Sequence, residues 1–227
     1  MLALRCKMSS MASPRRPVPR KRAPLSRERI VQAAFDLADR EGLEAFSMRK
    51  LGRALGVEAM SLYHFFPTKQ HLVDALVEAA VESVEVPPAG LAPVERLRRL
   101  CRAYRAMAHR HAKLFPIIAV HRLNTPAGVR FIERVLGLVH EATGDDESAA
   151  RYFRAVGYFL MGTGLDETSG YAKGPTAAEP VSDEFIAREC PLLARTSRYF
   201  ARSEWDTTFE LGLEAMMAAI ERSAARR

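Results

Sequence analysis

Apolar residues recur every three or four positions along most of the chain, which is the spacing of one face of an α-helix. The alternation of β-branched and polar residues that marks a strand is missing, and the sequence contains no Asn-Gly hairpin turn. The pattern therefore predicts an all-α protein. Four short helices are expected first, over residues 26–40, 48–55, 58–65 and 68–84.

Residues that favour helix ends stand at the borders of these four segments. Ser26, Ser47 and Thr68 are placed where an N-cap hydroxyl can accept from a free backbone N–H group. Gly56 follows the second helix and tolerates a positive φ, and Pro67 breaks the third. The caps and breakers thus agree with the apolar spacing.

Longer helices follow the segment VPPAGLAP at residues 86–93, which is typical of a boundary. They are expected over residues 93–113, 114–123, 126–143, 147–168, 183–202 and 204–222, with Pro191 interrupting the fifth of them and a loop at 170–182. The chain is therefore divided into an arm at 1–24, a small helical unit at 25–86 that includes the connecting fourth helix, and a larger helical domain at 87–227.

The first three helices lie within about 40 residues and enclose a glycine turn, which is the arrangement of a helix-turn-helix. One set of apolar residues can fill the core of this unit, so the remaining faces of its three helices must point to solvent. That set is Ile30, Ala34, Leu37, Met48, Leu51, Leu55, Val57, Leu62 and Phe66.

A recognition helix presents its first residues to base edges in the major groove of DNA. Ser61 can hydrogen-bond a base edge or a phosphate, and Met60 or Ala59 can contact a thymine methyl group. An ordinary helical bundle explains the inward residues, but it does not explain the outward pair Tyr63 and His64, which can donate to phosphates. The candidate DNA-binding residues are Arg49, Lys50, Ala59, Met60, Ser61, Tyr63, His64 and Lys69, and Phe65 is left without a role.

The net charge of +7 is concentrated in one segment. Residues 1–24 contain seven Lys and Arg side chains and no acid, so the rest of the chain sums to zero. The proline- and arginine-rich stretch SPRRPVPRKRAP predicts a disordered arm. It is a solvated tail or an extended start, which is the interpretation that we favour from this segment alone, or an arm that lies along DNA phosphates.

Other chemistry is largely excluded by composition. Cys6, Cys101 and Cys190 are odd in number and widely spaced, which argues against a disulfide framework or a zinc site. No apolar run approaches the ~20 residues of a membrane helix, and the first residues lack the apolar core of a signal peptide. We therefore expect a cytoplasmic protein with no membrane contact, no catalytic residues, no metal and no cofactor.

Residues 26–76 resemble the N-terminal DNA-binding domain of the tetracycline-repressor (TetR) family. The resemblance rests on the alanine-rich first helix ending in EG at 41–42, on SMR at 47–49, LxxxLGV at 51–57, SLY at 61–63 and FxxK at 66–69. It implies a homodimeric transcriptional regulator, usually a repressor that a small ligand releases from DNA, and it implies no enzymatic activity.

The segments FRAVGYFLMGTGLDET at 153–168 and FELGLEAMMAAIE at 209–221 are similar to the ligand-binding and dimerisation half of the tetracycline repressor branch. On this resemblance, His121 corresponds to a histidine that takes part in metal-bound drug recognition, and Asp166 to an acid from the partner subunit. Ala103, Gly137 and Thr125 stand where that branch grips its drug with polar groups. We therefore expect a ligand other than tetracycline with magnesium, and a structural role for His121.

Two helices carry the pattern of a subunit interface. The helix at 204–222 has two apolar stripes, so it needs a second partner besides its own core. The helix at 147–168 contains small residues that permit close approach of another helix. Two such helices from each subunit could form an intermolecular four-helix bundle, as the family uses. A wholly intramolecular bundle is the alternative.

A ligand pocket is expected to be mainly apolar with a few polar groups. The aggregate of aromatic, Met and His residues suggests a bulky, partly aromatic ligand, although each residue alone also fits a plain core. The candidates are Tyr104, Met107, His111, Phe115, His121, Val135, Tyr152, Phe153 and Tyr158.

The expected function is that of a homodimeric, ligand-responsive DNA-binding regulator, a repressor released from a palindromic operator by a small and largely apolar molecule. Two alternatives stay open. One is a small-molecule enzyme or carrier with a basic tail, which turnover without DNA affinity would reveal. The other is a non-specific architectural DNA binder, whose binding would disappear with residues 1–24.

Overall fold

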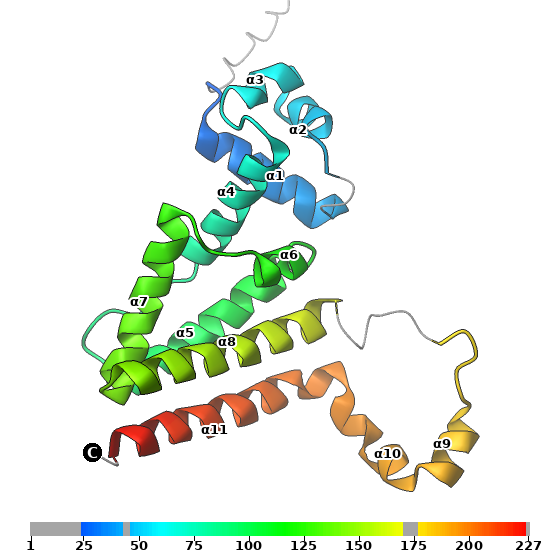
Figure 1. Cartoon of the computed structure of the whole chain (residues 1–227). Helices are drawn as coiled ribbons and strands as arrows, with labels where there is room; N and C mark the ends of the chain where they lie inside the picture. Colours follow the sequence, from blue (N-terminus) through cyan, green and yellow to red (C-terminus); the bar gives the residue numbers. More distant parts are fainter. Residues whose placement is uncertain (1–23, 43–45, 170–176, 226–227) are drawn as a thin grey trace, which may run out of the picture.

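Helices account for the regular secondary structure of the part of the chain that the computed structural model describes, residues 24–42, 46–169 and 177–225 (Figure 1). This confirms the all-α prediction. The predicted arm, apart from Pro24, lies outside the described residues. Within the described residues, no helix is long and apolar enough to cross a membrane.

Four helices form the N-terminal unit: α1 (Arg27–Glu41), α2 (Met48–Leu55), α3 (Ala59–Tyr63) and α4 (Lys69–Glu82). The three predicted hydroxyl caps are present, since Ser26, Ser47 and Thr68 accept from the N–H groups of the residues three positions on. Gly56 ends α2 in the left-handed conformation, with φ 68° and ψ 38°. Local chemistry therefore sets these helix ends.

The predicted core of the N-terminal unit is confirmed with one adjustment. Leu51, Leu62 and Phe66 are completely buried, whereas Val57 is only partly buried against them. The third helix is shorter than the predicted 58–65, because it ends at Tyr63 and continues as a turn toward Pro67. Proline disfavours the helical conformation of the residue before it, so the helix cannot run on to Phe66.

Gly52 allows α2 and α3 to approach each other closely. A Cβ atom at this position would lie 2.9 Å from the carbonyl oxygen of Val57 and 3.2 Å from the backbone nitrogen of Ala59. Both neighbours are backbone atoms at the turn between the two helices, so neither can move aside as a flexible side chain would. The angle between α2 and α3 therefore depends on the missing side chain.

We expect Gly52→Ala to lower the free energy of unfolding by about 1–3 kcal/mol through overpacking at this turn. Gly137→Ala is the matched control, because no heavy atom lies within 4 Å of a Cβ built there. That exchange should raise stability by roughly 0.5–1 kcal/mol through helix propensity. Urea unfolding at a fixed protomer concentration measures both, and equal effects of the two exchanges would contradict this account.

The C-terminal body consists of α5 (Pro93–Arg110), α6 (Phe115–Val120), α7 (Pro126–Thr143), α8 (Asp146–Ser169) and α11 (Trp205–Ala225). α5, α7 and α8 pack against one another, and α11 lies along α8 and also contacts α5 and α7 (Figure 1). The helix predicted for 93–113 ends earlier, at Arg110, because residues 111–114 form a turn. α4 runs from the N-terminal unit into contact with α5, α6 and α7.

A second arm, made of the short helices that connect α8 to α11, projects from the body (Figure 1), and below it is simply called the arm. It contains α9 (Asp183–Glu189), α10 (Pro191–Thr196) and two 3-10 turns, Ser197–Phe200 and Arg202–Glu204. The prediction of one interrupted helix over 183–202 was therefore only partly correct. No residue of these four elements is buried, so packing within the chain gives the arm little support.

Candidate nucleic-acid interface and ligand cavity

The first turn of α3 presents small and apolar side chains to solvent. Met60 is 69% exposed, and Ala59 and Ser61 are partly exposed beside it. Leu62 alone of this helix is buried, so it ties α3 to the core and leaves the other residues facing outward. These exposed residues are the ones that the sequence predicts to face base edges.

Two of the predicted phosphate anchors are exposed at the end of α3. Tyr63 is partly open to solvent, and His64 is the exposed C-cap residue of the helix. Lys69 is exposed at the start of α4, where its ammonium group donates to the carbonyl oxygen of Phe46 at 3.2 Å. An ammonium group has three donors. The bond to Phe46 therefore positions Lys69 and leaves further donor capacity for a phosphate.

The two basic residues of α2 have different surroundings. Arg49 is exposed at the start of the helix. The ammonium group of Lys50 lies 2.7 Å from a carboxylate oxygen of Glu41, and this hydrogen bond lowers the pKa of Glu41. Lys50 thus joins α2 to the end of α1. Arg49 lies in the same helical unit as α3. Among the described residues, it forms no ion pair comparable to that between Lys50 and Glu41.

Arg27 is a basic residue of this unit that was not among the sequence-based candidates. Its guanidinium group donates to the carbonyl oxygen of Phe65 at 2.6 Å and lies 4.3 Å from the centre of the Phe66 ring. Phe65 itself is partly buried against the core. Phe65, to which the sequence pattern assigned no role, is therefore a packing residue. Its backbone carbonyl group holds Arg27 beside α3.

A cavity of about 270 Å³ opens inside the C-terminal body. α5, α7 and α8 supply most of its walls, and the end of α4 and the segment after α6 close it. Five of the predicted ligand-binding residues line it: Tyr104, His121, Val135, Phe153 and Tyr158. Cys101, Phe131 and Arg154 also line it, although the sequence did not single them out for this role.

The other four predicted ligand-binding residues do not line this cavity. Met107 is 1% exposed within the core, and Phe115 fills the space over Gly164, where a Cβ would meet its ring at 2.4 Å. The hydroxyl of Tyr152 donates to the carbonyl oxygen of Ala219. Met107, Phe115 and Tyr152 are apolar or aromatic, like the residues that line the cavity. The helical spacing of the sequence therefore could not distinguish core residues from cavity residues.

His111 serves the junction between the two parts of the molecule. Its Nδ1 lies 3.1 Å from a carboxylate oxygen of Asp39 on α1, and its ring lies 4.8 Å from that of Phe35. Nearby, Lys113 donates to the carbonyl group of Arg40. The prediction that His111 belongs to the pocket is therefore corrected, because the turn after α5 directs this ring toward α1.

His121 combines a place in the cavity wall with a link to α4. Its Nε2 lies 2.9 Å from a carboxylate oxygen of Asp74 on α4, and its Nδ1 lies 3.1 Å from the carbonyl oxygen of Arg122. Asp166 lies elsewhere, on the exposed side of α8. Among the described residues, no cluster of three or more His, Cys, Asp or Glu side chains could hold a metal ion.

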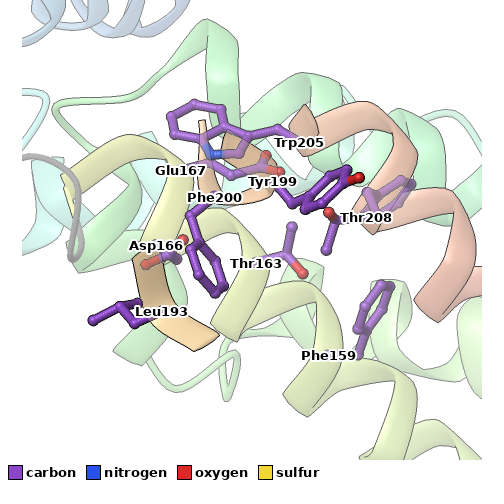
Figure 2. Close-up of a pocket in the computed structure, with 10 residues that line it drawn as sticks. Phe159, Thr163, Asp166, Glu167, Leu193, Tyr199, Phe200, Trp205 and Thr208 are labelled. Carbon is purple, nitrogen blue, oxygen red and sulfur yellow. The ribbon is translucent and has the colours of Figure 1, made fainter. Parts of the chain in front are cut away.

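A second hollow, of about 520 Å³, lies where the arm meets α8 and α11. Figure 2 shows aromatic side chains around it, among them Phe159 from α8, Trp205 from α11, and Tyr199 and Phe200 from the arm. Asp166 and Glu167 border the same hollow. It is separate from the first cavity, since no residue lines both.

Ion pairs connect α5 to α8 and α11, and one of the acids involved, Glu167, also borders this hollow. Both carboxylate oxygens of the buried Glu167 bind the guanidinium group of Arg105, at 2.8 and 2.9 Å, and His109 lies 2.6 Å from one of them. Arg98 and Arg102 form paired hydrogen bonds with Glu214 and Glu210 on α11. The arginine side of α5 therefore holds the two helices expected at the subunit interface.

Comparisons with known proteins match both parts of the chain. The family model described as tetracyclin repressor-like, C-terminal domain, matches residues 90–224, and the model described as bacterial regulatory proteins, tetR family, matches residues 30–76. The repressor DrrR1 of Streptomyces coeruleorubidus is 26% identical over 94% of this chain and 83% of its own length. The class A tetracycline repressor from transposon 1721 of Escherichia coli is 28% identical over 83% and 87%.

Solved structures give the same picture. A possible TetR family transcriptional regulator from Streptomyces coelicolor A3(2) matches with a TM-score of 0.71 and 30% identity, over 87% of this chain and 99% of its own. The S. coelicolor protein ActR in complex with actinorhodin matches with a TM-score of 0.71 and 28% identity, over 89% and 99%.

Proposed function

Because the chain belongs to the tetR family of bacterial regulatory proteins, we propose that it is a homodimeric repressor that a small, largely apolar molecule releases from a palindromic operator. DNA binding in transcription regulation is the established activity of this family, which is not a class of enzymes. The operator, the homodimer and the release are the parts that the proposal adds.

The observation that carries the proposal is that α4 joins the DNA-reading unit to the cavity. At its start, Lys69 donates to the carbonyl oxygen of Phe46, which directly precedes the N-cap of α2. Further along, Asp74 binds His121, which lines the cavity, and Val84, just past its end, lines the cavity too. A ligand in the cavity therefore contacts the residues that position α4, and through α4 it can change the placement of α3.

The two recognition helices of a dimer must lie about 34–36 Å apart to read successive major grooves. A ligand that binds better to a different spacing shifts the population away from the DNA-bound form, by an amount set by its differential affinity. In the proposed roles, Ala59, Met60 and Ser61 read bases, while Arg49, Tyr63, His64 and Lys69 contact phosphates. The proposed boundaries of the DNA-binding and ligand-binding domains are 25–86 and 87–227.

The lining of the cavity supports an aromatic effector. Its walls are apolar and include the rings of Tyr104, Phe131, Phe153 and Tyr158. The similar protein ActR has been solved in complex with actinorhodin and with (S)-DNPA. Of the ligand-binding residues predicted from sequence, we keep Tyr104, His121, Val135, Phe153 and Tyr158 in this role.

Exposed apolar side chains support a homodimer through α8 and α11. Leu211 is 73% exposed on α11 and Tyr158 is 58% exposed on α8, and the arm exposes Leu192 and Phe200. Large exposed apolar patches mark protein–protein and other interaction sites. A second copy of the chain would cover them and complete a four-helix bundle.

Leu211→Glu tests the dimer. We expect this exchange to convert dimers to monomers in sedimentation velocity, and to weaken operator binding because one subunit then reads only one half-site. Val129→Glu is the matched control, since Val129 is 50% exposed on α7, outside the proposed interface. The proposed interface would be wrong if the wild-type protein were already monomeric. It would also be wrong if Leu211→Glu, like the control Val129→Glu, remained dimeric.

A further inference from the structure

The polar side chains that line the 270 Å³ cavity are hydrogen-bond donors, and none of them is a carboxylate. They belong to Cys101, Tyr104, His121, Arg154 and Tyr158. Burial raises the pKa of Tyr104 to about 12 and that of Cys101 to about 12. The phenol and the thiol therefore stay neutral at physiological pH, and the cavity contains no ionised acid among its described lining residues.

Arg154 supplies a permanent positive charge at the cavity wall. Its guanidinium group donates to the hydroxyl of Tyr158 and lies 4.9 Å from the centre of that ring. These contacts orient a flexible side chain at the α8 side of the cavity, and no carboxylate among the described residues forms an ion pair with it. A guanidinium group so placed can bind a carboxylate in a bidentate manner.

His121 faces acceptors at both ring nitrogens. Nδ1 lies 3.1 Å from the carbonyl oxygen of Arg122, and Nε2 lies 2.9 Å from a carboxylate oxygen of Asp74. Neither acceptor can donate, so both hydrogen bonds form only when each nitrogen carries a proton. His121 therefore adds a ring N–H donor to the cavity wall, beside the guanidinium group of Arg154.

We propose that the effector is a planar aromatic acid, with a carboxylate or acidic phenol that binds between His121 and Arg154. This proposal rests on the function proposed above and adds the chemical class of the effector. The aromatic walls contact the ring system, the guanidinium group of Arg154 pairs with the acid, and the ring of His121 donates a hydrogen bond to it. A cationic ligand would meet the guanidinium group and no compensating carboxylate among the described lining residues, so the cavity discriminates against it.

The same geometry assigns a regulatory role to the contact between His121 and Asp74. An acid in the cavity and the carboxylate of Asp74 then compete for hydrogen bonds from the ring of His121, and the two like charges repel each other. Ligand entry therefore weakens the hold of His121 on α4, which carries Lys69 and its contact with Phe46 in the DNA-binding unit. Ligand binding in the cavity is in this way coupled to α4, the helix that we propose positions α3.

Three probes of one shape test the chemical class: anthraquinone-2-carboxylate, its neutral carboxamide, and the cationic 2-aminomethyl analogue. Isothermal titration of the full-length protein should show the carboxylate binding at least roughly 10-fold more tightly than the carboxamide, and the amine most weakly. A factor of 10 corresponds to about 1.4 kcal/mol. Equal affinities, a preference for the amine, or no binding of the carboxylate would each overturn the assignment.

Arg154→Gln should reduce the preference for the carboxylate over the carboxamide several-fold. Arg151→Gln is the matched control, because Arg151 lies on the same helix, outside the cavity, and pairs with Glu147. Comparing the two probes on each variant separates a loss of charge recognition from a loss of folding, which would weaken both probes alike. An unchanged ratio in Arg154→Gln would overturn the role of this residue.

Asp74→Asn tests the competition. Removing the competing charge should tighten binding of the carboxylate several-fold and should shrink its effect on operator affinity, because ligand binding then no longer weakens a contact that holds α4. No change in either quantity would overturn the regulatory role. If wild-type protein showed the acid preference without binding an operator, the proposed function would fail while the assigned ligand class would stand.

Discussion

Exchanging Tyr63 and Lys69 together for alanine is expected to lower the affinity for every DNA sequence by at least roughly 100-fold. Each side chain is placed to donate to a phosphate, and a hydrogen bond to a charged group contributes about 1.5–3 kcal/mol. Phosphate contacts carry no sequence information, so specific and non-specific DNA should lose affinity equally. The slope of log affinity against log salt should fall by about two, because Lys69 is the charged member of the pair and each of the two protomers loses one ammonium group that neutralises a phosphate.

Single exchanges at the reading face should behave differently. Met60→Ala and Ser61→Ala should change which bases are preferred near the half-site, by about 1–3 kcal/mol at the contacted base pair. Arg151→Ala on α8 is the control for removal of a positive charge far from α3. Fluorescence anisotropy against a set of single-base operator variants measures all of these. Uniform losses of affinity at Met60, Ser61, Tyr63 and Lys69 would show that the division into reading and anchoring residues is wrong.

Arg105→Met is expected to lower the free energy of unfolding by about 3–5 kcal/mol, because it leaves a buried carboxylate without its main partner. The Glu167 side chain is 5% exposed, and Arg105 binds both of its oxygens. The second acid bound by Arg105, Asp206, is 89% exposed and contributes little by comparison. The effect thus comes from the buried member of the cluster.

Two further variants test this origin. Arg99→Ala breaks an exposed ion pair with Glu95 and should lower the free energy of unfolding far less than Arg105→Met does. Combining Arg105→Met with Glu167→Leu should recover most of the stability, since neither charge is then left unpaired. The midpoints of urea unfolding, compared at one protomer concentration, decide the matter. A cost for Arg105→Met no larger than that for Arg99→Ala would contradict the account.

The N-terminal unit could be predicted closely because its determinants are local. Ser26, Ser47 and Thr68 cap their helices through residues three positions away. Leu62 and Phe66 are four positions apart and are both buried, as their spacing required. The role of Gly52 could not be predicted in the same way, because its closest contacts depend on the angle at which α3 crosses α2.

The cavity was predicted less well because its chemistry is that of the core. Phe153 lines it and Phe115 does not, and the difference is that Phe115 packs over Gly164, which is 49 positions later in the chain. Arg154 was overlooked because a basic residue on a helix is ordinarily a solvated group. The pairing of Arg105 with Glu167 joins residues 62 positions apart and leaves no periodic signal in the sequence.

The most direct test of the central claim compares DNA from the region upstream of the protein's own gene with a shuffled sequence of the same composition. Anisotropy at about 0.15 M salt, where exposed charges are well screened, should show a preference of roughly 1,000-fold or more for the upstream DNA. Deleting residues 1–24 should weaken binding to both and keep that preference. Equal affinity for the two sequences, or loss of all binding on deletion of residues 1–24, would contradict a sequence-reading function for α3.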